Sequence, residues 1–386
     1  MKKKFYYAIA QSDDIDSSDA ANDVVDRCIF QLQGRKASAG LIYMGITIDH
    51  QAVLDIIHER LGDIELIGCT TDGEFSSETG YIQDSILLML FCSDEIDFIS
   101  GSIDISNSNP ESIKTEICTS LGETGKKPRL GILLTDGFTL NGEDSLEIIS
   151  SVFNDEVPFF GGVAADKWRK TGTNQFLGND VLDDMAVYLL FCGNFDYSFA
   201  TGTGWTPVGD YGIITNSEKN VVKEINNQPA IEFYRYLLGK SAVPAIDVPM
   251  AVYDENDSLM FLRTTVLDDI GKDGSVTFFA SMPRGYKVRL TVVDRNAIID
   301  GVKAAATGAL NKFPRGKQPS IAVCFSCTAR RALLGLRTEE ECTAAQSILG
   351  ESVIVFGFYT YGEFSPRLDT MKTRFHNETF VCLLLE

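Results

Sequence analysis

The chain has 386 residues, of which 44% are hydrophobic and 23% charged, a balance typical of a globular protein rather than a disordered one. Its 34 basic and 54 acidic residues give a formal charge of −20, which disfavours binding to nucleic-acid phosphates or anionic lipid. No apolar run approaches the roughly 20 residues of a membrane span. We therefore expect a cytoplasmic protein that binds neither nucleic acid nor membrane, with two domains of roughly 150–200 residues.

Short apolar runs alternate with helical periodicity in the first half of the chain. Apolar residues at helical spacing predict one helix over 19–33 and a second that Asp49 caps and Gly62 ends. Two more helices are expected, one over 110–122 and one that Asn141 caps. Runs typical of strands lie at 5–10, 40–46, 64–69, 85–91, 96–105, 129–136, 157–168 (entering a Gly-rich turn) and 185–193.

The second half repeats this alternation. Helices are predicted over 294–310 and 339–349, and strands at 248–254, 258–266, 276–280, 286–293, 319–327 and 352–360. Pro, Gly and polar residues gather at 209–220, so we place there the boundary between domains 1–210 and 211–386. The expected fold class is mixed α/β (α+β), with two duplicated-looking domains whose mixed or antiparallel sheets are covered by outer helices.

One turn is written twice. The stretch "IGCTTDGEFS" at 67–76 agrees with "FGFYTYGEFS" at 356–365 in six of ten positions, and "GGVAAD" at 161–166 is a looser third copy. Each copy follows an apolar strand and precedes another that ends in a mixture of Leu, Phe and Cys. This predicts a repeated strand–turn–strand unit.

Five motifs in order, "IGCTTDGEFS", "PFFGGVAAD", "FSCTARRALLG", "GFYTYGEFSP" and "HNETF", resemble the FIST proteins, which have a FIST N domain followed by a FIST C domain. The resemblance covers roughly residues 25–380. It implies a bacterial intracellular sensory module that binds a small ligand such as an amino acid. The expected signalling partner is a chemoreceptor, a histidine kinase or a cyclic-dinucleotide enzyme, and some members resemble haem-containing nitric-oxide sensors.

The two good copies of the turn supply carboxylates. Glu74 and Glu363 each follow a Gly at the end of an apolar strand, where binding pockets form. They either face one cleft and hold a ligand ammonium or a cation, or each caps its own turn by accepting backbone N–H bonds. Thr71, Asp72 and Tyr361 would line the same rim.

The third turn and Arg330 are candidates for contact with a ligand carboxylate. Gly162 and Asp166 belong to the Gly-rich third turn, which either presents backbone N–H groups or packs a strand closely against a helix. The guanidinium of Arg330 suits a carboxylate ligand, and the alternative is an ion pair with Glu363.

The motif "HNETF" begins with His376 and Asn377, which either meet the ligand or orient Glu363, or are structural. Cys324 and Cys327 lie three apart in a predicted strand and so point to opposite faces, which disfavours a redox or zinc pair. The alternative function is an enzyme, with Cys327 and His376 as nucleophile and base, or with carboxylates holding Mg²⁺. We expect no cofactor, with haem on a histidine as a further alternative.

Overall fold

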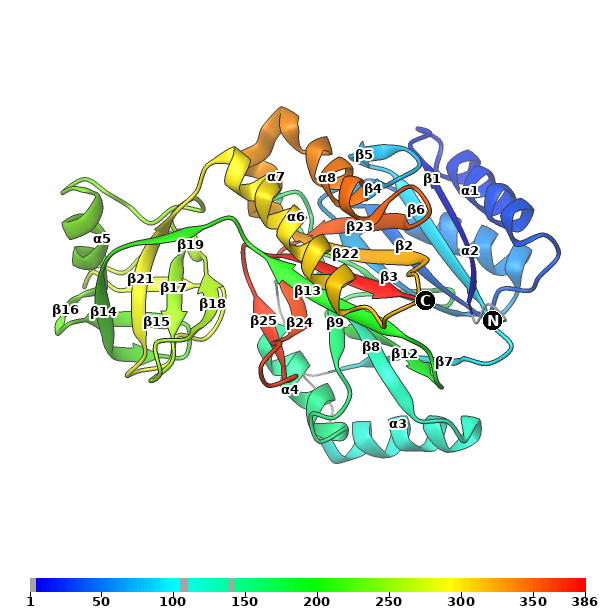
Figure 1. Ribbon diagram of the computed structural model, residues 1–386, viewed down its shortest axis with the longest axis horizontal. Helices are drawn as coiled ribbons and strands as arrows, with labels where there is room; N and C mark the ends of the chain where they lie inside the picture. The colour runs from blue at the N-terminus through cyan, green and yellow to red at the C-terminus, as the bar shows by residue number, and fades with distance from the viewer. Residues whose placement is uncertain (1–4, 105–109, 139–141) are drawn as a thin grey trace.

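The computed structural model describes residues 5–104, 110–138 and 142–386, and it confirms a mixed α/β fold with helices on the outside (Figure 1). The predicted helix over 19–33 is α1 (Ser17–Leu32), and α2 (His50–Leu61) begins after Asp49, whose carboxylate accepts from Ala52 N at 3.2 Å. Asn141, expected to cap α4 (Gly142–Val152), lies outside the described residues.

Three copies of one β-α-β-α-β-hairpin-β unit form the main body. The first contains α1, α2, β1 (Tyr6–Ser12), β2 (Ala39–Gly45), β3 (Glu65–Thr71), β4 (Glu74–Ser76), β5 (Gly80–Ile82) and β6 (Ile86–Cys92). The second contains α3 (Pro110–Thr124), α4, β7 (Asp97–Ile103), β8 (Pro128–Thr135), β9 (Phe159–Val163), β10 (Gln175–Leu177), β11 (Asp180–Leu182) and β12 (Ala186–Cys192). The third contains β13 (Tyr197–Gly202), α6 (Arg295–Lys312), β22 (Ile321–Cys327), α7 (Thr328–Leu334), α8 (Glu339–Leu349), β23 (Ile354–Thr360), β24 (Glu363–Pro366), β25 (Thr373–His376) and β26 (Phe380–Leu385).

The hairpin of each unit pairs with the sheet of another unit. The three sheets have the orders β1-β6-β2-β3-β10-β11, β7-β12-β8-β9-β24-β25 and β13-β26-β22-β23-β4-β5. The hairpin of the first unit thus completes the third sheet, that of the second completes the first, and that of the third completes the second. In each sheet the two central strands are parallel, and their neighbours are antiparallel to them. The expected domain division at 210/211 stays a prediction, because this exchange shows only that segments on both sides of it share sheets.

A glycine lies opposite the phenylalanine of each exchanged hairpin. The register pairs Gly68 with Phe176, Gly161 with Phe364, and Gly357 with Phe75. A Cβ at Gly68 or Gly357 would lie 2.0 Å from a neighbouring strand's carbonyl oxygen, and one at Gly161 would lie 1.9 Å from one. The Gly at this position is therefore required by the close approach of the parallel neighbouring strand of its own unit.

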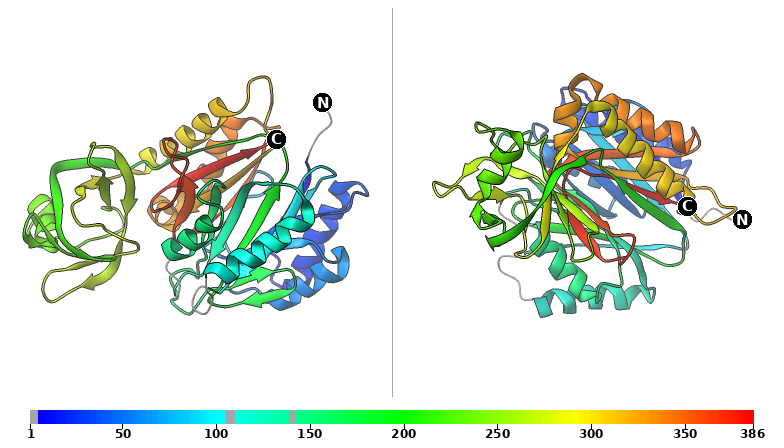
Figure 2. Two further views of the ribbon diagram at one scale, coloured as in Figure 1. Left: turned by 90° about the horizontal axis from the view of Figure 1, so that it is seen from below. Right: turned by 60° about the vertical axis from the view of Figure 1, so that its left-hand side comes forward.

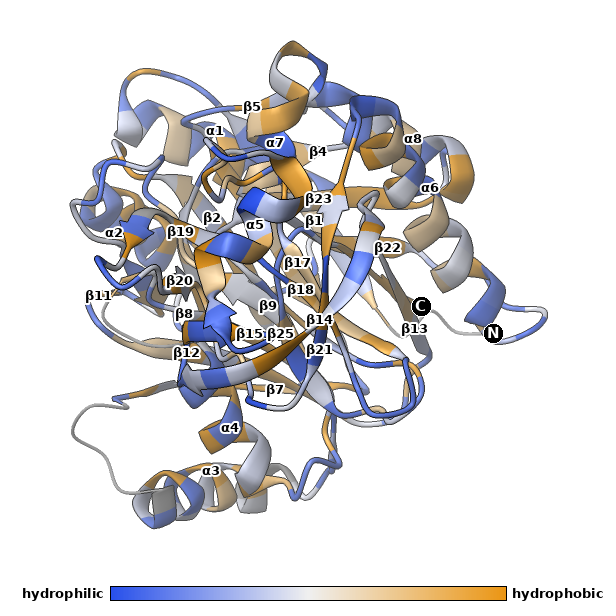
Figure 3. Ribbon diagram, turned by 90° about the vertical axis from the view of Figure 1, so that its left-hand side faces the viewer, coloured by the Kyte–Doolittle hydropathy of each residue, from blue (hydrophilic) through white to orange (hydrophobic). Residues whose placement is uncertain are grey.

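The three sheets face one another across a central core, where the rings of Tyr43 and Phe358 lie 4.3 Å apart and Phe325 packs edge-on to Phe358. Their outer faces are covered by α1 and α2, by α3 and α4, and by α6 to α8 (Figure 2). Helices such as α3 and α6 carry both hydrophilic and hydrophobic residues (Figure 3), because each buries one face on a sheet. No helix in the described ranges is long and apolar enough to cross a membrane.

A fourth sheet is inserted into the third unit and lies at one side of the body (Figure 1). Together with helix α5 (Ala230–Leu238), this sheet forms its own core. Its strands are β14 (Thr206–Glu218), β15 (Val221–Ile225), β16 (Gln228–Pro229), β17 (Met250–Tyr253), β18 (Leu259–Arg263), β19 (Thr265–Ile270), β20 (Val276–Phe278) and β21 (Lys287–Val292). Most of the segment 209–220, where the sequence places the domain boundary, belongs to strand β14. Its Gly209, at φ +72°, lies where the register with β21 shifts, which is how a long strand accommodates a Gly.

Candidate ligand-binding site

The two repeated glutamates occupy the same structural position. Oε2 of Glu363 accepts a hydrogen bond from Thr379 N at 3.1 Å, and Oε2 of Glu74 accepts from Ser85 N at 3.2 Å. Gln175 takes this position in the second unit, where its Oε1 accepts from Met185 N at 3.3 Å. The geometry therefore supports the capping interpretation. The two glutamates belong to different sheets, with Glu74 opposite Phe358 and Glu363 opposite Gly162.

Burial disfavours the ionised form of these carboxyl groups. Both are fully buried, and burial raises the pKa of Glu74 to about 7 and that of Glu363 well above its usual range. Burial likewise raises the pKa of Glu378 to about 8. Within the described chain, Oε1 of Glu363 and Oε2 of Glu378 are buried without a hydrogen-bond partner. A carboxyl group in such a setting is favoured in its protonated form.

Arg330 is fully buried and its partner is Glu341, not Glu363. Nη2 lies 2.7 Å from Oε1 of Glu341, and Nε donates to the same oxygen at 2.9 Å. Nη2 also donates to Ile298 O at 2.9 Å, and Nη1 donates to Thr203 O. The remaining oxygen of Glu341 accepts from the hydroxyls of Ser326 and Tyr359, each at 2.8 Å. The guanidinium expected to bind a ligand is thus committed to an internal network.

Asp72 and Thr71 are also engaged internally. Oδ2 of Asp72 pairs with Nη2 of Arg331 at 2.8 Å and accepts from Thr328, while burial raises the pKa of Asp72 to about 6. The Thr71 hydroxyl donates to Glu74 and accepts from Gly73 N at 3.2 Å. The contacts of Asp72 join the first turn to α7. The sequence patterns did not predict this helix, although "TARRALL" is rich in helix-forming residues.

Tyr361 and Asp166 meet across the exchanged pair of strands. The Tyr361 hydroxyl donates to Oδ1 of Asp166 at 2.7 Å and accepts from Trp168 N at 2.5 Å. Oδ2 of Asp166 accepts from Thr171 N at 2.8 Å, so hydrogen bonds hold the loop after β9 at Asp166, Trp168 and Thr171. A Cβ at Gly162 would lie 2.4 Å from Oγ1 of Thr360, which supports its close-packing role.

The remaining candidates lie near the connection to the inserted sheet. Nε2 of His376 is 3.2 Å from Ser365 O, and burial lowers the pKa of His376 to about 4. Oδ1 of Asn377 lies 3.5 Å from Thr264 N. Burial, with the charge of Glu363 as a further cause, raises the pKa of Cys327 well above its usual range, which is the opposite of an activated thiolate.

A cavity of about 490 Å³ lies between the main body and the inserted sheet. Its walls are largely aromatic, and the rings of Trp168 and Phe138 lie 5.1 and 6.0 Å from that of Tyr361. Of the sequence candidates, only Tyr361 lines this cavity. The described lining residues are Gly137, Phe138, Gly142, Val163, Trp168, Lys170, Lys219, Asn220, Val266, Phe278, Phe279, Tyr361 and Phe375.

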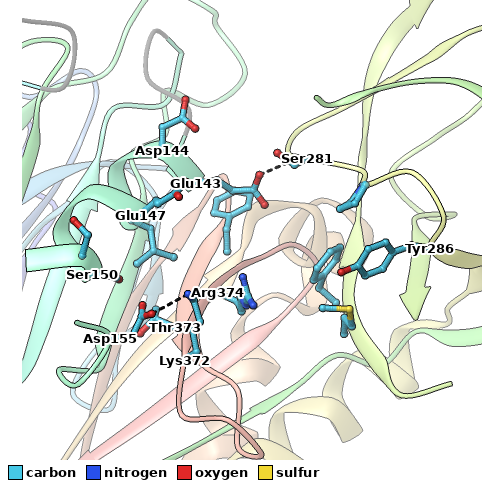
Figure 4. Close-up of a pocket in the computed structure, with 16 residues that line it drawn as sticks. Glu143, Asp144, Glu147, Ser150, Asp155, Ser281, Tyr286, Lys372, Thr373 and Arg374 are labelled. Atoms are coloured by element: carbon cyan, nitrogen blue, oxygen red, sulfur yellow. Dashed lines mark hydrogen bonds and ion pairs between the residues drawn. The ribbon is translucent and has the colours of Figure 1, made fainter. Parts of the chain in front are cut away.

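A second cavity of about 470 Å³ is lined by residues of the same two parts of the molecule, the main body and the inserted sheet (Figure 4). Arg263 pairs with Glu143 and donates to Phe375 O at 2.9 Å, and Glu143 accepts from Ser281 N at 2.8 Å. Phe375 lines both cavities. The second cavity is bordered by the carboxylates of Glu143, Asp144, Glu147 and Asp155 and by the cations Lys372 and Arg374.

Sequence reasoning missed most of the aromatic cavity. Trp168 and Lys170 lie in a loop, while Lys219 and Asn220 lie in the β14–β15 turn, and none belongs to a repeated motif. The predicted strand runs 157–168, 258–266 and 276–280 contain several of the lining residues, namely Val163, Trp168, Val266, Phe278 and Phe279, but nothing in these runs predicts contact with a ligand. In the described part of the chain, no three His, Cys, Asp or Glu side chains group in a way that would hold a metal ion.

The fold defines a class of α/β protein in which three units exchange hairpins and a fourth sheet is inserted in the third unit. The FIST N domain matches residues 38–228 and the FIST C domain matches residues 230–366. The chain therefore belongs to the FIST family, which is associated with sensory signal transduction.

The chain is also similar to proteins described as uncharacterized in two other organisms. It is 26% identical over 203 residues to one from Methanocaldococcus jannaschii, covering 51% of this chain and 39% of the relative. It is 24% identical over 220 residues to one from Mycobacterium tuberculosis, covering 53% of this chain and 55% of the relative. The matched region thus spans about two-fifths to one-half of the length of these relatives.

Proposed function

We propose that this protein is a cytoplasmic sensory module that binds a small molecule in the 490 Å³ aromatic cavity. The volume lies in the roughly 300–1,000 Å³ range of small-molecule sites, and such sites combine apolar walls with a few polar groups. Here Lys170, Lys219 and Asn220 are those polar groups. The ligand class is an amino acid or a similar small molecule.

The placement of the cavity supports a signalling role. Its lining comes from the main body on one side and from β14–β15, β19 and the β20 end on the other. A ligand that contacts both parts favours the arrangement in which both contacts are made, and this differential affinity is what shifts a conformational equilibrium. A chemoreceptor, a histidine kinase or a cyclic-dinucleotide enzyme would receive the signal as a partner.

An enzyme is less well supported. Cys327 and His376 are both buried, the imidazole contacts Ser365 O, and the thiol is surrounded by groups that keep it protonated. Asp72, Asp166 and the two glutamates, which would hold Mg²⁺ in the alternative enzyme, instead bind protein donors. Sensing therefore accounts for more of the geometry than catalysis does.

A thermal-shift screen against amino acids, small carboxylates and haem tests the proposal, because a ligand that binds only the folded state must raise the melting temperature. The shift should shrink in Phe279→Ala, which opens the cavity wall, and persist in Phe30→Ala, an exposed aromatic on α1. No shift with any compound, or an equal shift in both variants, would refute binding in this cavity. A Soret band after haem addition that His376→Gln removes would favour the haem alternative.

A further inference from the structure

The charge of the aromatic cavity is opposite to that of the whole protein. The chain carries a formal charge of −20, yet among the described residues that line this cavity the charged ones are Lys170 and Lys219 alone. No ion pair of either lysine is found within the described ranges, and the nearest charged neighbour of Lys219 in the chain is Glu218, which interacts with it electrostatically and pairs with Lys223. The neighbouring cavity, by contrast, is lined by four carboxylates together with Lys372 and Arg374. The two cavities therefore differ in the charged groups that line them.

The two lysines also come from opposite sides. Lys170 lies on the loop after β9, which Tyr361 and Asp166 hold to the main body, and Lys219 lies in the turn between β14 and β15 of the inserted sheet. Both are exposed, and both have a left-handed backbone conformation, with φ of 57° and 52°. Asn220, beside Lys219, donates to Phe278 O at 2.7 Å, which holds that turn against the aromatic wall.

The walls between the lysines are flat and apolar. Tyr361 cannot turn freely because its hydroxyl is bonded to Asp166 and to Trp168 N, so the tilted Trp168–Tyr361 pair is a rigid surface. Phe279 and Phe375 complete the apolar lining. Such surfaces favour a flat ring, while lysine ammonium groups favour an anion.

The geometry points to a ligand class for the proposed sensory site: a small molecule with a flat apolar body and an anionic group, of which an aromatic carboxylate is the simplest case. This inference rests on the proposed function and restricts it. The anionic group would be attracted by both lysines, one from each side, while the ring contacts the aromatic walls between them. A ligand of this class would thereby join the main body to the inserted sheet.

Three probes with one ring and different charges test the inference by calorimetry: phenylacetate, its neutral amide and phenethylamine. Phenylacetate should bind most tightly, and its affinity should fall as salt rises, because the ion pairs are partly exposed. Lys170→Gln and Lys219→Gln should each weaken phenylacetate binding roughly two- to five-fold, the effect of losing one such pair, and leave amide binding unchanged. Lys272→Gln, an exposed lysine of the inserted sheet outside the cavity, should change neither.

Two outcomes would overturn the inference and leave the sensory proposal intact. One is that the amide or the amine binds as tightly as phenylacetate and that Phe279→Ala weakens this binding. The other is a phenylacetate affinity that neither lysine variant changes. If no small molecule of any charge binds in the cavity, the proposed function and the ligand class fail together.

Discussion

The carboxylate of Glu363 accepts a hydrogen bond from the backbone N–H of Thr379 at 3.1 Å, and the same bond joins Glu74 to Ser85 and Gln175 to Met185. Each bond fixes the start of an exchanged hairpin to the residue before the last strand of its own unit. The third case uses an amide in place of a carboxyl group. A neutral acceptor is therefore sufficient for this role.

The first prediction concerns that acceptor. Glu363→Gln should leave the free energy of unfolding at pH 7 unchanged or increased, because the amide keeps the bond and carries no buried charge. Glu363→Ala should lower it by about 1–3 kcal/mol, because Thr379 N would be left buried without a partner. Urea unfolding of both variants checks this, with Glu74→Gln and Glu74→Ala as the matched pair. Equal destabilisation by Gln and Ala would show that the charge itself is needed.

The second prediction concerns pH above neutrality. The folded pKa of Glu378 is raised to about 8 by burial, so the folded state binds more protons than the unfolded chain between the ordinary glutamate pKa and pH 8. Stability from this group is therefore fully present in acid and is lost as pH rises towards 8. Between pH 6.5 and 8.5 the wild-type melting temperature should fall by several degrees more than that of Glu378→Gln. Parallel curves for the two proteins would contradict the assignment.

The third prediction concerns the acid side. The pKa of His376 is lowered to about 4 by burial, so the unfolded state binds more protons between pH 4 and the ordinary histidine pKa near 6.5. Its contribution is present above pH 6.5 and is lost as pH falls towards 4. His376→Gln keeps a donor for Ser365 O and should be less sensitive to acid than the wild type. His58→Gln, whose imidazole lies half-exposed on α2, is the control and should follow the wild-type curve.

The fourth prediction separates fold from ligand binding at Arg330. Arg330→Met should destabilise the protein by about 3–5 kcal/mol, because Glu341 would remain buried without its cation. Arg330→Met combined with Glu341→Gln should recover much of that loss, since the amide that replaces the carboxylate would still accept from Ser326 or Tyr359. Denaturant unfolding of the single and double variants measures the coupling. If Arg330→Met instead removed ligand binding at unchanged stability, the ligand role expected from the sequence would be right.

The fifth prediction concerns the exchanged hairpins. Gly68→Ala and Gly357→Ala should each cost about 3 kcal/mol or more, because the new Cβ would meet a carbonyl oxygen at 2.0 Å and overpacking of a core is costly. Gly122→Ala, on helix α3 with open space around its Cβ position, is the control and should be neutral or slightly stabilising. Tolerance of Ala at both strand positions would contradict the tight packing of Phe176 and Phe75 there.

Much of the local structure could be predicted from the amino-acid sequence. Helical spacing marked α1, α2, α3, α6 and α8, and short apolar runs marked the central strands, because burial of one helix face or of a whole strand is written in the residues of that segment. The repeated Gly-Glu-Phe-Ser turn also predicted a repeated unit. α5 was not predicted although it buries Ala230, Ile231 and Tyr234. β14 was not predicted because most of its residues are not buried and it is held by pairing with β15 and β21.

Tertiary structure alone decided which groups meet. Nothing near Glu74 in the chain says that its hairpin completes the sheet of β23, and nothing near Arg330 selects Glu341 over Glu363. The aromatic cavity joins residues from 137 to 375 that no motif connects, because its walls are formed by the docking of the inserted sheet on the exchanged body. Strand pairing and sheet docking depend on contacts distant in sequence, whereas periodicity reports only on burial within one element.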